Sequence, residues 1–402
     1  MKKILWVSPY APYDRVSHAG GKIHNYYVKT FHKSGNFDIT LLSLCLQSEK
    51  ELLDLDKYQI KNMIFVMDRS KVKRFQRRAT SAWSYVNPFD KYAGVCLAYE
   101  RNAMHRMINL YKKQGNCPDI VILQWTFSLM FLPVIKRYFP NSRIVAIEED
   151  VTFLGYWRKW NNATGIKKWF WKCRYNKMHS LEVQMLGQAD LIVTNNPKDS
   201  ELLVKSGINR EDIFTASPYF QNYSLCERKP EGKDILFFGA MSRAENYESA
   251  LWFIERVMPL LSEEHVRFIV VGGNPPEKLK CINRGDVIIK GYVNDVTPYF
   301  EKSLCFVAPL LFGAGIKIKI LEAMSAGIPV LTNQIGIEGI PAQNGAEYFL
   351  CETAEEYAIT IKKFINGEID IKKWCENEKN FISRNYRLRA NTEAFMDKLL
   401  RS

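Results

Sequence analysis

The sequence predicts an α/β protein with two doubly wound, Rossmann-like domains that face a central cleft, followed by a helical C-terminal extension. Short apolar strands alternate with helical stretches along most of the chain, which is typical of parallel sheets covered by helices on both faces. The alternation breaks once, at the polar segment 221–233 (QNYSLCERKPEGK), and then restarts. With 402 residues, 47% apolar and 25% charged, the chain is long enough for two ordinary cores.

The first domain is predicted at 1–222. It begins with an apolar strand, a glycine-containing stretch (HAGG) and a helix at 22–35, and further apolar runs bounded by turn residues follow. Its predicted strands are 3–8, 38–44, 119–125, 143–150 and 189–195.

The second domain is predicted at 234–375, after an interdomain linker at 221–233. Its predicted strands are 234–240, 266–273, 287–293, 303–309, 328–333 and 346–352. Past residue 370 the pattern is helical to the end, so 376–402 is predicted to form helices that pack back towards the first domain.

The composition argues against a secreted or membrane-spanning protein. The apolar run Ile4–Val7 is too short for a signal peptide, and no run approaches the roughly 20 apolar residues of a membrane helix. Nine cysteines are scattered singly without a CxxC pair, as expected for reduced thiols in a cytoplasm. We therefore expect a cytoplasmic protein.

The net charge of +13 is concentrated in two stretches, Arg69–Arg78 and the tryptophan-rich Tyr156–Lys177. Lysine and arginine beside tryptophan suit an anionic membrane surface, here the inner face of the cell membrane. A solvated helix face with a half-buried aromatic side is the equally open alternative. Single-stranded nucleic acid would also suit such residues, but no nucleic-acid-binding signature accompanies the charge, so we expect no nucleic-acid partner.

The segment 308–333 (APLLFGAGIKIKILEAMSAGIPVLTN) places two lysines where a helix must begin, near Ile316. Lys317 and Lys319 would oppose the positive end of the helix dipole unless an anion lies between them and the helix end. Glycines before the helix let the backbone approach a ligand closely, and free helix N–H groups bind anions. A bound diphosphate would remove the electrostatic conflict.

Glu322 lies about one helical turn after Lys319. Its carboxylate could accept hydrogen bonds from the two hydroxyls of a ribose. The alternative is a plain surface ion pair between Lys319 and Glu322. The helix is flanked by two apolar strands, however, and a carboxylate packed between strands would be costly without a partner.

The stretch FGAGIKIKILEAMSAGIPVLTN resembles the donor-site signature of the retaining GT-B glycosyltransferases of family 4. The stretches at 237–261, 291–310 and 344–361, and ADLIVTNNPKDSELL at 189–203, follow in the order and spacing of that family. The resemblance implies the GT-B fold and transfer of a sugar from a nucleoside-diphosphate donor, held by the second domain, to an acceptor held by the first. It implies no cofactor and no metal ion, because basic groups and helix ends neutralise the phosphates.

In this resemblance, Glu322 matches the second glutamate of the family's E-x7-E motif, the ribose ligand. Ala314 occupies the position of the first glutamate, which affects the donor sugar or phosphate contacts, while Gly313 and Gly315 keep backbone amides available next to Ile316.

Further donor contacts are implied in the same domain. Arg243, in GAMSRAEN, is the basic residue that would join Lys317 or Lys319 at the diphosphate, although the family's usual arginine and lysine positions differ here. Tyr292 and Val293 match the position that contacts the nucleobase. An ordinary strand end is the alternative for these two residues.

In the first domain, Gly20 and Gly21 resemble the family's glycine loop after the first strand, which approaches the donor phosphate. A simple turn is the alternative. Glu149 and Asp150 end a strand at the position where relatives often carry His-Asp, and carboxylates at that edge of a parallel sheet can orient or deprotonate an acceptor hydroxyl. We favour Asp150 over Glu149. Both are alternatively helix-capping anions.

Three functions remain open from the sequence. The first is a glycosyltransferase in which Lys317 and Lys319 stabilise charge on the leaving diphosphate. It would act on a glycan, lipid-linked or protein acceptor in bacterial surface polysaccharide or glycoprotein glycan synthesis. The second is a catalytically silent GT-B subunit that binds an acceptor and stabilises a partner enzyme. The third is a nucleotide-sugar epimerase or phosphorylase on the same scaffold.

Overall fold

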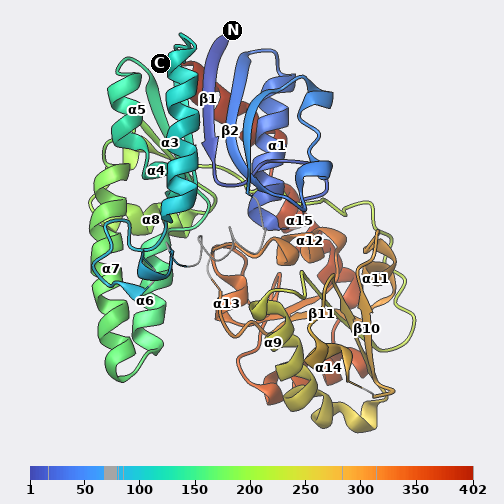
Figure 1. Ribbon diagram of the computed structural model, residues 1–402. Coiled ribbons are helices and arrows are strands. Elements are labelled where there is room, and N and C mark those ends of the chain that lie inside the picture. The colour runs from blue at the N-terminus through green and yellow to red at the C-terminus, as the bar shows by residue number, and fades with distance from the viewer. Residues whose placement is uncertain are drawn as a thin grey trace. The chain divides into compact units, whose positions relative to one another are not determined.

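The chain folds into two compact units in the computed structural model (Figure 1). Unit 1 contains residues 1–218 and 389–402, and unit 2 contains residues 219–388. The structure describes residues 1–16, 18–67, 79, 81–84, 86–282, 284–313 and 315–401. The basic stretch 69–78 and Ala314, both singled out in the sequence, lie outside the described residues.

Unit 1 is built on a parallel sheet of seven strands in the order β3-β2-β1-β4-β5-β6-β7. The order reverses between β1 and β4, the arrangement of a doubly wound sheet, in which ligands bind beyond the carboxyl ends of the strands. The edge strands β3 and β7 were not among the predicted strands. The strands are β1 (Lys2–Ser8), β2 (Phe37–Leu46), β3 (Lys61–Met67), β4 (Ile120–Gln124), β5 (Arg143–Glu148), β6 (Leu191–Thr194) and β7 (Ile213–Thr215).

Helices cover both faces of this sheet. They are α1 (Ala19–Lys33), α3 (Ala98–Lys113), α4 (Trp125–Leu129), α5 (Leu132–Tyr138), α6 (Thr152–Asn162), α7 (Gly165–Leu186), α8 (Pro197–Lys205) and α16 (Leu388–Leu400), with short 3-10 turns at Lys50–Leu52, Asp56–Tyr58 and Arg210–Asp212.

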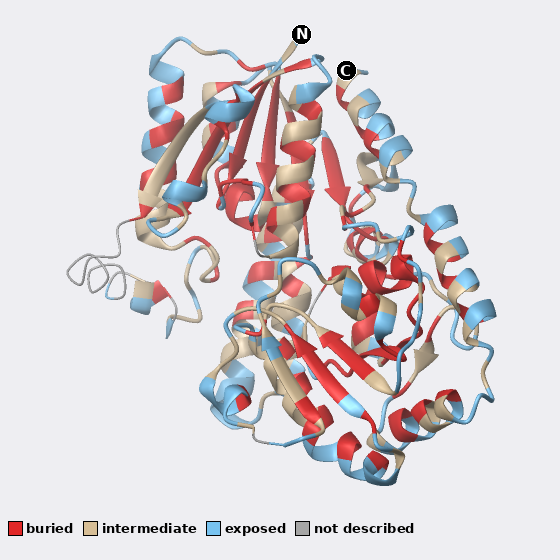
Figure 2. Cartoon of the chain, turned by 90° about the vertical axis from the view of Figure 1, so that its right-hand side faces the viewer, coloured by how far each residue is buried: buried red, intermediate tan, exposed pale blue. Residues whose placement is uncertain are grey.

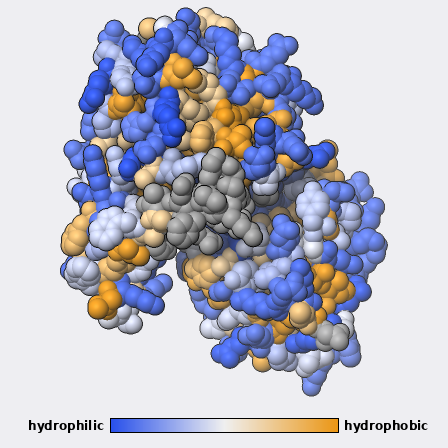
Figure 3. Space-filling view, viewed as in Figure 1, coloured by the Kyte–Doolittle hydropathy of each residue, from blue (hydrophilic) through white to orange (hydrophobic). Residues whose placement is uncertain are grey.

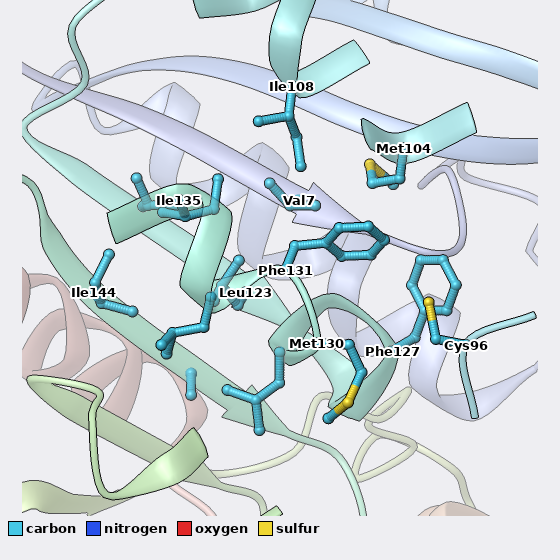
Figure 4. Close-up of a cluster of buried hydrophobic side chains, with 14 of the residues drawn as sticks. Val7, Cys96, Met104, Ile108, Leu123, Phe127, Met130, Phe131, Ile135 and Ile144 are labelled. Carbon is cyan, nitrogen blue, oxygen red and sulfur yellow. The ribbon is translucent and has the colours of Figure 1, made fainter. Parts of the chain in front are cut away.

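One face of the unit 1 sheet packs against α3, α4 and α5 in a single apolar cluster (Figure 4). Val7 of β1 and Leu123 of β4 meet Ile108 of α3 and Ile135 of α5, and all four side chains are fully buried. The inner strands are buried on both faces (Figure 2), which explains why their sequences are continuous apolar runs rather than alternating ones.

Unit 2 contains a parallel sheet of six strands in the order β10-β9-β8-β11-β12-β13. Each corresponds to one of the six strands predicted for the second domain. The strands are β8 (Asp234–Phe238), β9 (Arg267–Val271), β10 (Val287–Gly291), β11 (Cys305–Ala308), β12 (Val330–Thr332) and β13 (Phe349–Leu350).

The helices of unit 2 include the lysine-bearing α12, which runs from the end of β11 towards β12. They are α9 (Ala244–Trp252), which continues as a π turn at Phe253–Val257 and a 3-10 turn at Met258–Glu264, then α10 (Glu277–Lys280), α11 (Thr297–Lys302), α12 (Ile318–Ala326), α13 (Gln334–Ile337), α14 (Ala354–Ile365) and α15 (Ile371–Asn385).

The predicted linker 221–233 lies along unit 2. The backbone N–H of Tyr223 donates to the Ser325 hydroxyl at 2.9 Å, and that of Lys229 donates to the Glu301 carbonyl at 2.9 Å. These bonds satisfy backbone N–H groups that would otherwise donate to water. The chain therefore passes from one unit to the other between Pro218 and Tyr219, four residues before the predicted end of the first domain at 222.

The C-terminal residues divide between the units. Within unit 2, Trp374 of α15 stacks on Phe349 at 3.9 Å between ring centroids. Within unit 1, Phe395 of α16 is fully buried with its ring 5.1 Å from Phe31. The division thus falls between Leu388 and Arg389, whereas the sequence suggested a single extension from 376 to 402.

Over the described part of the chain, no helix is both long and apolar enough to cross a bilayer. All nine cysteines are present as free thiols.

Candidate functional site

In unit 2, the loop between β11 and α12 is shaped by two glycines. Gly313 and Gly315 have φ angles of 141° and 69°, in the region that favours glycine. The helix begins at Ile318 with Lys317 as its N-cap, so it starts two residues later than the sequence suggested, and Ile316 lies in the loop. The first turn contains no acidic residue. The Lys317 side chain does not cap this turn, and such a helix N-terminus favours a bound anion.

Lys319 is held in place by contacts from β8 and α9. Its ammonium donates to Asn246 Oδ1 at 2.7 Å and lies 4.5 Å from the centre of the Phe237 ring. Burial lowers the pKa of Lys319 to about 7, and the nearby Lys317 and Arg243 act in the same direction against Glu245. An anion at this position would favour the charged ammonium and raise that pKa.

Lys317 lies on the loop side of the helix start. Its ammonium donates to the Gly315 carbonyl and lies 4.0 Å from a carboxylate oxygen of Glu338. Both side chains are largely buried, with 10% and 14% of their surface exposed. Lys317 therefore braces the glycine turn and places a cation next to the first helical amides.

Glu322 is buried inside α12, with only 4% of its surface exposed. Its Oε1 accepts a hydrogen bond from the backbone N–H of Gln221 at 3.4 Å. The carboxylate raises the pKa of the Tyr223 hydroxyl, together with burial of that side chain, which is the larger cause. Glu322 is thus an interior acid rather than a surface residue, as its place between two apolar strands suggested.

Arg243 is the N-cap of α9, and its guanidinium pairs with Glu245 while 55% of the side chain remains exposed. Asn246, in the same turn, is buried and donates to the Ala240 carbonyl at 2.9 Å. Asn246 was not among the residues predicted from the sequence, because its burial and its contact with Lys319 arise only in the folded chain.

The loops after β8 and β9 touch through their glycines. A Cβ atom on Gly272 would lie 1.7 Å from the Gly239 carbonyl oxygen, and its φ of 154° is unsuitable for other residues. Tyr292 follows β10 with 77% of its surface exposed, next to the half-buried Val293. The predicted nucleobase contact is therefore a solvent-facing aromatic ring at a strand end.

In unit 1, Gly20 and Gly21 lie in the first turn of α1, not in a loop before it. His18 is the N-cap, and its Nδ1 accepts a hydrogen bond from the Gly21 N–H at 2.9 Å. Because His18 caps the helix, it begins at Ala19, three residues earlier than predicted. A Cβ on Gly21 would lie 2.4 Å from Val16, and one on Gly20 would lie 3.1 Å from Trp125. Close packing explains both glycines.

Trp125 begins α4 with a φ of 63°, which is a strained conformation for a side chain of this size. Its ring meets Tyr10 and the buried His24 edge-on, at 5.3 and 5.4 Å. Burial lowers the pKa of His24 to about 3, so this histidine is neutral. The sequence analysis treated Trp125 only as the end of a strand.

Glu149 is buried at the end of β5 and is held by two amides. Its Oε1 accepts from Gln124 Nε2 at 2.6 Å, and its Oε2 accepts from Asn195 Nδ2. Gln124 in turn accepts from the Trp6 indole at 3.2 Å. Burial raises the pKa of Glu149 to about 8, with a further contribution from Asp150. Glu149 can therefore exist as a neutral acid at physiological pH.

Glu148, one residue before Glu149, forms a buried pair of acids with Glu182 of α7. Glu148 Oε2 and Glu182 Oε1 both accept from the Thr126 hydroxyl, at 2.8 and 3.3 Å. Burial raises the pKa of both carboxyls, that of Glu182 to about 7, and Glu182 adds to the rise at Glu148. Two acids around one hydroxyl share protons rather than ionise together.

Glu182 performs the helix-capping role that the sequence analysis considered for Glu149 and Asp150. Its two carboxylate oxygens accept from the backbone N–H groups of Thr152 and Phe153, each at 2.9 Å, at the start of α6. Asp150 itself is exposed at the carboxyl end of β5. Glu182 was missed because it lies about 30 residues downstream, on α7, with no local signature.

Among the described residues, no group of three or more histidine, cysteine or acidic side chains is arranged to hold a metal ion.

Comparison with known proteins identifies unit 2. Residues 232–366 match the family model described as Glycosyl transferases group 1. The match includes Arg243, Lys317, Lys319 and Glu322. The match confirms, for this part of the chain, the resemblance to glycosyltransferases expected from the sequence.

A relative with a curated sequence is an uncharacterized 44.6 kDa protein in the cps region of Klebsiella pneumoniae. It is 24% identical over 164 residues, which represent 38% of this chain and 42% of that protein. The chain therefore matches about two fifths of the relative's length.

Solved structures resemble the whole chain. HepE of Anabaena, in complex with UDP and glucose, has a TM-score of 0.68 at 12% identity, with 100% of both chains covered. Sucrose-phosphate synthase of Thermosynechococcus elongatus has a TM-score of 0.69 at 12% identity, covering 100% of this chain and 98% of that one. Staphylococcus aureus TarM, crystallised with Fondaparinux, alpha-GlcNAc-glycerol and UDP, has a TM-score of 0.66 at 11% identity over 100% of both chains. At these identities the likeness shows the fold, which is GT-B as predicted.

Proposed function

Starting from a glycosyl transferases group 1 domain on a GT-B fold, we propose that this chain is a retaining glycosyltransferase. It would move a sugar from a nucleoside-diphosphate donor to a glycan, lipid-linked or protein acceptor in surface polysaccharide or glycoprotein glycan synthesis. Relatives support this assignment: HepE was crystallised with UDP-glucose and TarM with UDP and a glycan. The curated relative is named for a cps region.

The observation that carries the proposal is the cationic start of α12. Lys317 and Lys319 stand at a helix N-terminus with no acid in its first turn, and Arg243 contributes a third positive charge on α9. Lys317 and Arg243 add to the effect of burial in lowering the pKa of Lys319, so a diphosphate placed among these cations would relieve an electrostatic cost. A diphosphate also matches the donors offered by the glycine turn.

Glu322 would select a nucleotide over a bare diphosphate. Its carboxylate lies one turn further along α12, on the same helix as the phosphate-binding lysines, and is almost fully buried. A buried carboxylate gains most from partners that donate hydrogen bonds, and the two hydroxyls of a ribose supply two donors at once.

Transfer would proceed with little help from a side-chain base. The acceptor oxygen forms its bond to the anomeric carbon while the bond from that carbon to the β-phosphate oxygen breaks, and this oxygen keeps the electron pair. The acceptor proton then passes to the departing phosphate oxygen. Lys317, Lys319, Arg243 and the helix amides would stabilise the growing phosphate charge, which strengthens binding in the transition state relative to the ground state.

Unit 1 would supply the acceptor side. Asp150 is the exposed carboxylate at the strand end, and Glu149 is a buried carboxyl fixed by two amides. We propose that Asp150 orients the acceptor hydroxyl and that Glu149 fixes the local geometry. A lipid-linked acceptor would be met at a membrane surface, and residues 156–177 supply exposed aromatic and basic groups for peripheral attachment there. No cofactor or metal takes part in this proposal.

One observation favours a second candidate, the catalytically silent subunit. Ala314 stands where the resemblance places the first motif glutamate. A chain that had lost donor chemistry could still bind an acceptor and stabilise a partner enzyme.

Calorimetric titration with UDP and, separately, GDP distinguishes the two candidates. If the first is right, one nucleotide binds the wild type and K317A/K319A weakens binding at least tenfold, about 1.4 kcal/mol. K278A/K280A is the matched control, because these two lysines of α10 are exposed and pair with the surface acids Glu248 and Glu277. Binding of neither nucleotide to the wild type would favour the silent subunit.

A further inference from the structure

Helices α6 and α7 form a hairpin in unit 1 whose aromatic residues divide into two groups. The inner group fastens the two helices together: the ring of Tyr156 lies 5.8 Å from Trp171, and that of Trp160 lies 5.4 Å from Tyr175. Lys159 covers the Trp171 ring at 4.8 Å. The half-buried aromatic side considered in the sequence analysis is therefore real for these residues, and packing explains them.

The outer group has no such explanation. Ile166 and Trp169, one turn apart in the first turns of α7, have 86% and 54% of their surface exposed, and Phe89 has 70% exposed. The rings of Phe89 and Trp169 meet edge-on at 6.1 Å. Large apolar side chains gathered in this way on a surface usually mark an interaction site. We call Phe89, Ile166 and Trp169 the hairpin patch.

The hairpin patch is rigidly presented. Arg174 of α7 is buried and donates hydrogen bonds to the backbone carbonyls of Ser84, Asn87 and Ala93, and the Tyr156 hydroxyl also donates to Ala93 at 2.8 Å. These bonds fix the segment that carries Phe89 against α7. The exposed rings are therefore held in place by buried polar contacts.

The charge around the hairpin patch identifies the kind of partner. Lys167 and Lys168 lie between Ile166 and Trp169 in the sequence, both exposed, and no aspartate or glutamate occurs from Val151 to Leu181. Asp90, next to Phe89, accepts hydrogen bonds from backbone N–H groups of its own loop. Figure 3 shows hydrophobic and near-neutral residues beside strongly hydrophilic ones at the free end of this hairpin. A second copy of the chain would bring like charges together, whereas an anionic surface would neutralise them.

We propose that the hairpin patch docks on an anionic lipid bilayer. Ile166, Trp169 and Phe89 would enter the interface between headgroups and acyl chains, where indole rings are favoured, and Lys167 and Lys168 would meet lipid phosphates. The docking does not depend on the proposed reaction, since it uses none of the donor-site or carboxyl residues.

Co-sedimentation with vesicles tests the docking. The full chain should bind phosphatidylglycerol/phosphatidylcholine vesicles and should bind pure phosphatidylcholine at least tenfold more weakly. The K167E/K168E variant should partition to anionic vesicles at least tenfold more weakly. Each lysine near the surface strengthens binding about fivefold, and reversing its charge doubles the lost binding free energy. The I166S/W169S variant should lose as much again, even at low salt.

A matched control lies on α3 of the same unit. Leu110 is 49% exposed, with the exposed Lys112 and Lys113 beside it, but the aromatic residues of α3, Tyr99 and Tyr111, are not exposed. L110S/K112E/K113E should bind anionic vesicles within about twofold of the wild type.

Several outcomes would overturn the docking. One is equal binding of the wild type to neutral and anionic vesicles, and another is unchanged binding of both hairpin variants. A dimer in light scattering that I166S/W169S abolishes would make a second copy the occupant. Tighter binding to a single-stranded oligonucleotide than to vesicles would make nucleic acid the occupant of the hairpin patch. UDP and GDP titrations of the hairpin variants, expected to match the wild type, keep this result separate from the proposed function.

Discussion

Burial shifts the pKa values of two acids that end a strand in unit 1 and of a lysine in the helix that follows a strand in unit 2. Glu148 and Glu149 end β5 and have raised pKa values because of burial, whereas Lys319, in the helix after β11, has a lowered one. Both sheets are parallel and doubly wound. The comparison teaches that one architecture supports opposite electrostatics, set by a few residues at the carboxyl ends of the strands.

The largest expected effect is on the basic side of this comparison. K319M should lower the rate of sugar transfer about 100-fold, because it removes a charge that stabilises the leaving phosphate, which is comparable to losing one oxyanion donor. Turnover is measured as nucleotide released in the presence of acceptor. K278M, which changes an exposed lysine of α10, should stay within about twofold. A K319M rate equal to the wild type would remove Lys319 from the mechanism.

The next effect concerns how the loops around the basic site are built. G272A should destabilise unit 2 by about 3 kcal/mol, because its Cβ would overlap the Gly239 carbonyl and its φ is unfavourable. G273A is the control, since its Cβ would make only ordinary contact with Tyr292 at 3.7 Å. Urea unfolding of both variants provides the measurement. Similar midpoints for the two would contradict the close approach of these loops.

The acidic and basic sites should respond to pH in opposite ways. The pKa of Glu149 is about 8 in the folded protein, against the usual 4.5 of a glutamate in water. The folded state then keeps a proton that the unfolded state loses, so stability is full below pH 4.5 and falls as the pH rises towards 8. The slope is at most about 1.4 kcal/mol per pH unit. E149Q should flatten this slope, because glutamine does not titrate. The Asn195 side chain would turn its amide so that its oxygen accepts the new side-chain N–H at position 149 in place of donating.

The pKa of Lys319 is about 7 against 10.5, so its contribution has the reverse sign. The unfolded state keeps the extra proton between these values, and stability should rise with pH across that window. K319M should flatten this second slope. Denaturant unfolding from pH 5 to 9.5 measures both, with E201Q, an exposed acid of α8, as the control. If E149Q and K319M changed the slope relative to the wild type in the same direction, the contrast between the units would be contradicted.

The smallest effect is expected at the edge of the basic site. Arg243 pairs with Glu245 but has 55% of its side chain exposed, where ion pairs add little stability. R243Q should change the unfolding free energy by less than about 0.5 kcal/mol. It should weaken nucleotide binding a few-fold in calorimetry, since one of three cations is lost. A loss as large as that of K317A/K319A would show that Arg243 contributes as much to nucleotide binding as the two lysines together.

Much of the fold could be predicted because parallel strands buried on both faces are continuous apolar runs. The central strands of both sheets were found in this way, whereas β3 and β7 were not. The side chains of β7 are only half-buried, and so are most of those of β3. The start of α1 was placed too late because two glycines suggested a loop, while the His18 cap and close packing make them part of the helix.

The candidate site was predicted unevenly for a related reason. Lys317, Lys319 and Glu322 share one helix, and their spacing along the sequence already places them within about one turn of each other. Asn246, Glu182 and Trp125 reach their partners from distant parts of the chain, so their sequence neighbours say nothing about their contacts.

The sequence by itself determined the two parallel α/β units, the cationic start of α12 and the excess of positive charge, because each depends on residue type and local spacing. Only the tertiary structure decided which charges are buried and what they contact. In the folded chain Lys319 donates a hydrogen bond to Asn246, and two side-chain amides donate to Glu149. The tertiary structure also leaves Ile166 and Trp169 exposed while their neighbours are covered. Burial and pairing depend on segments that meet only after folding, and these contacts set pKa values and expose or hide apolar surface.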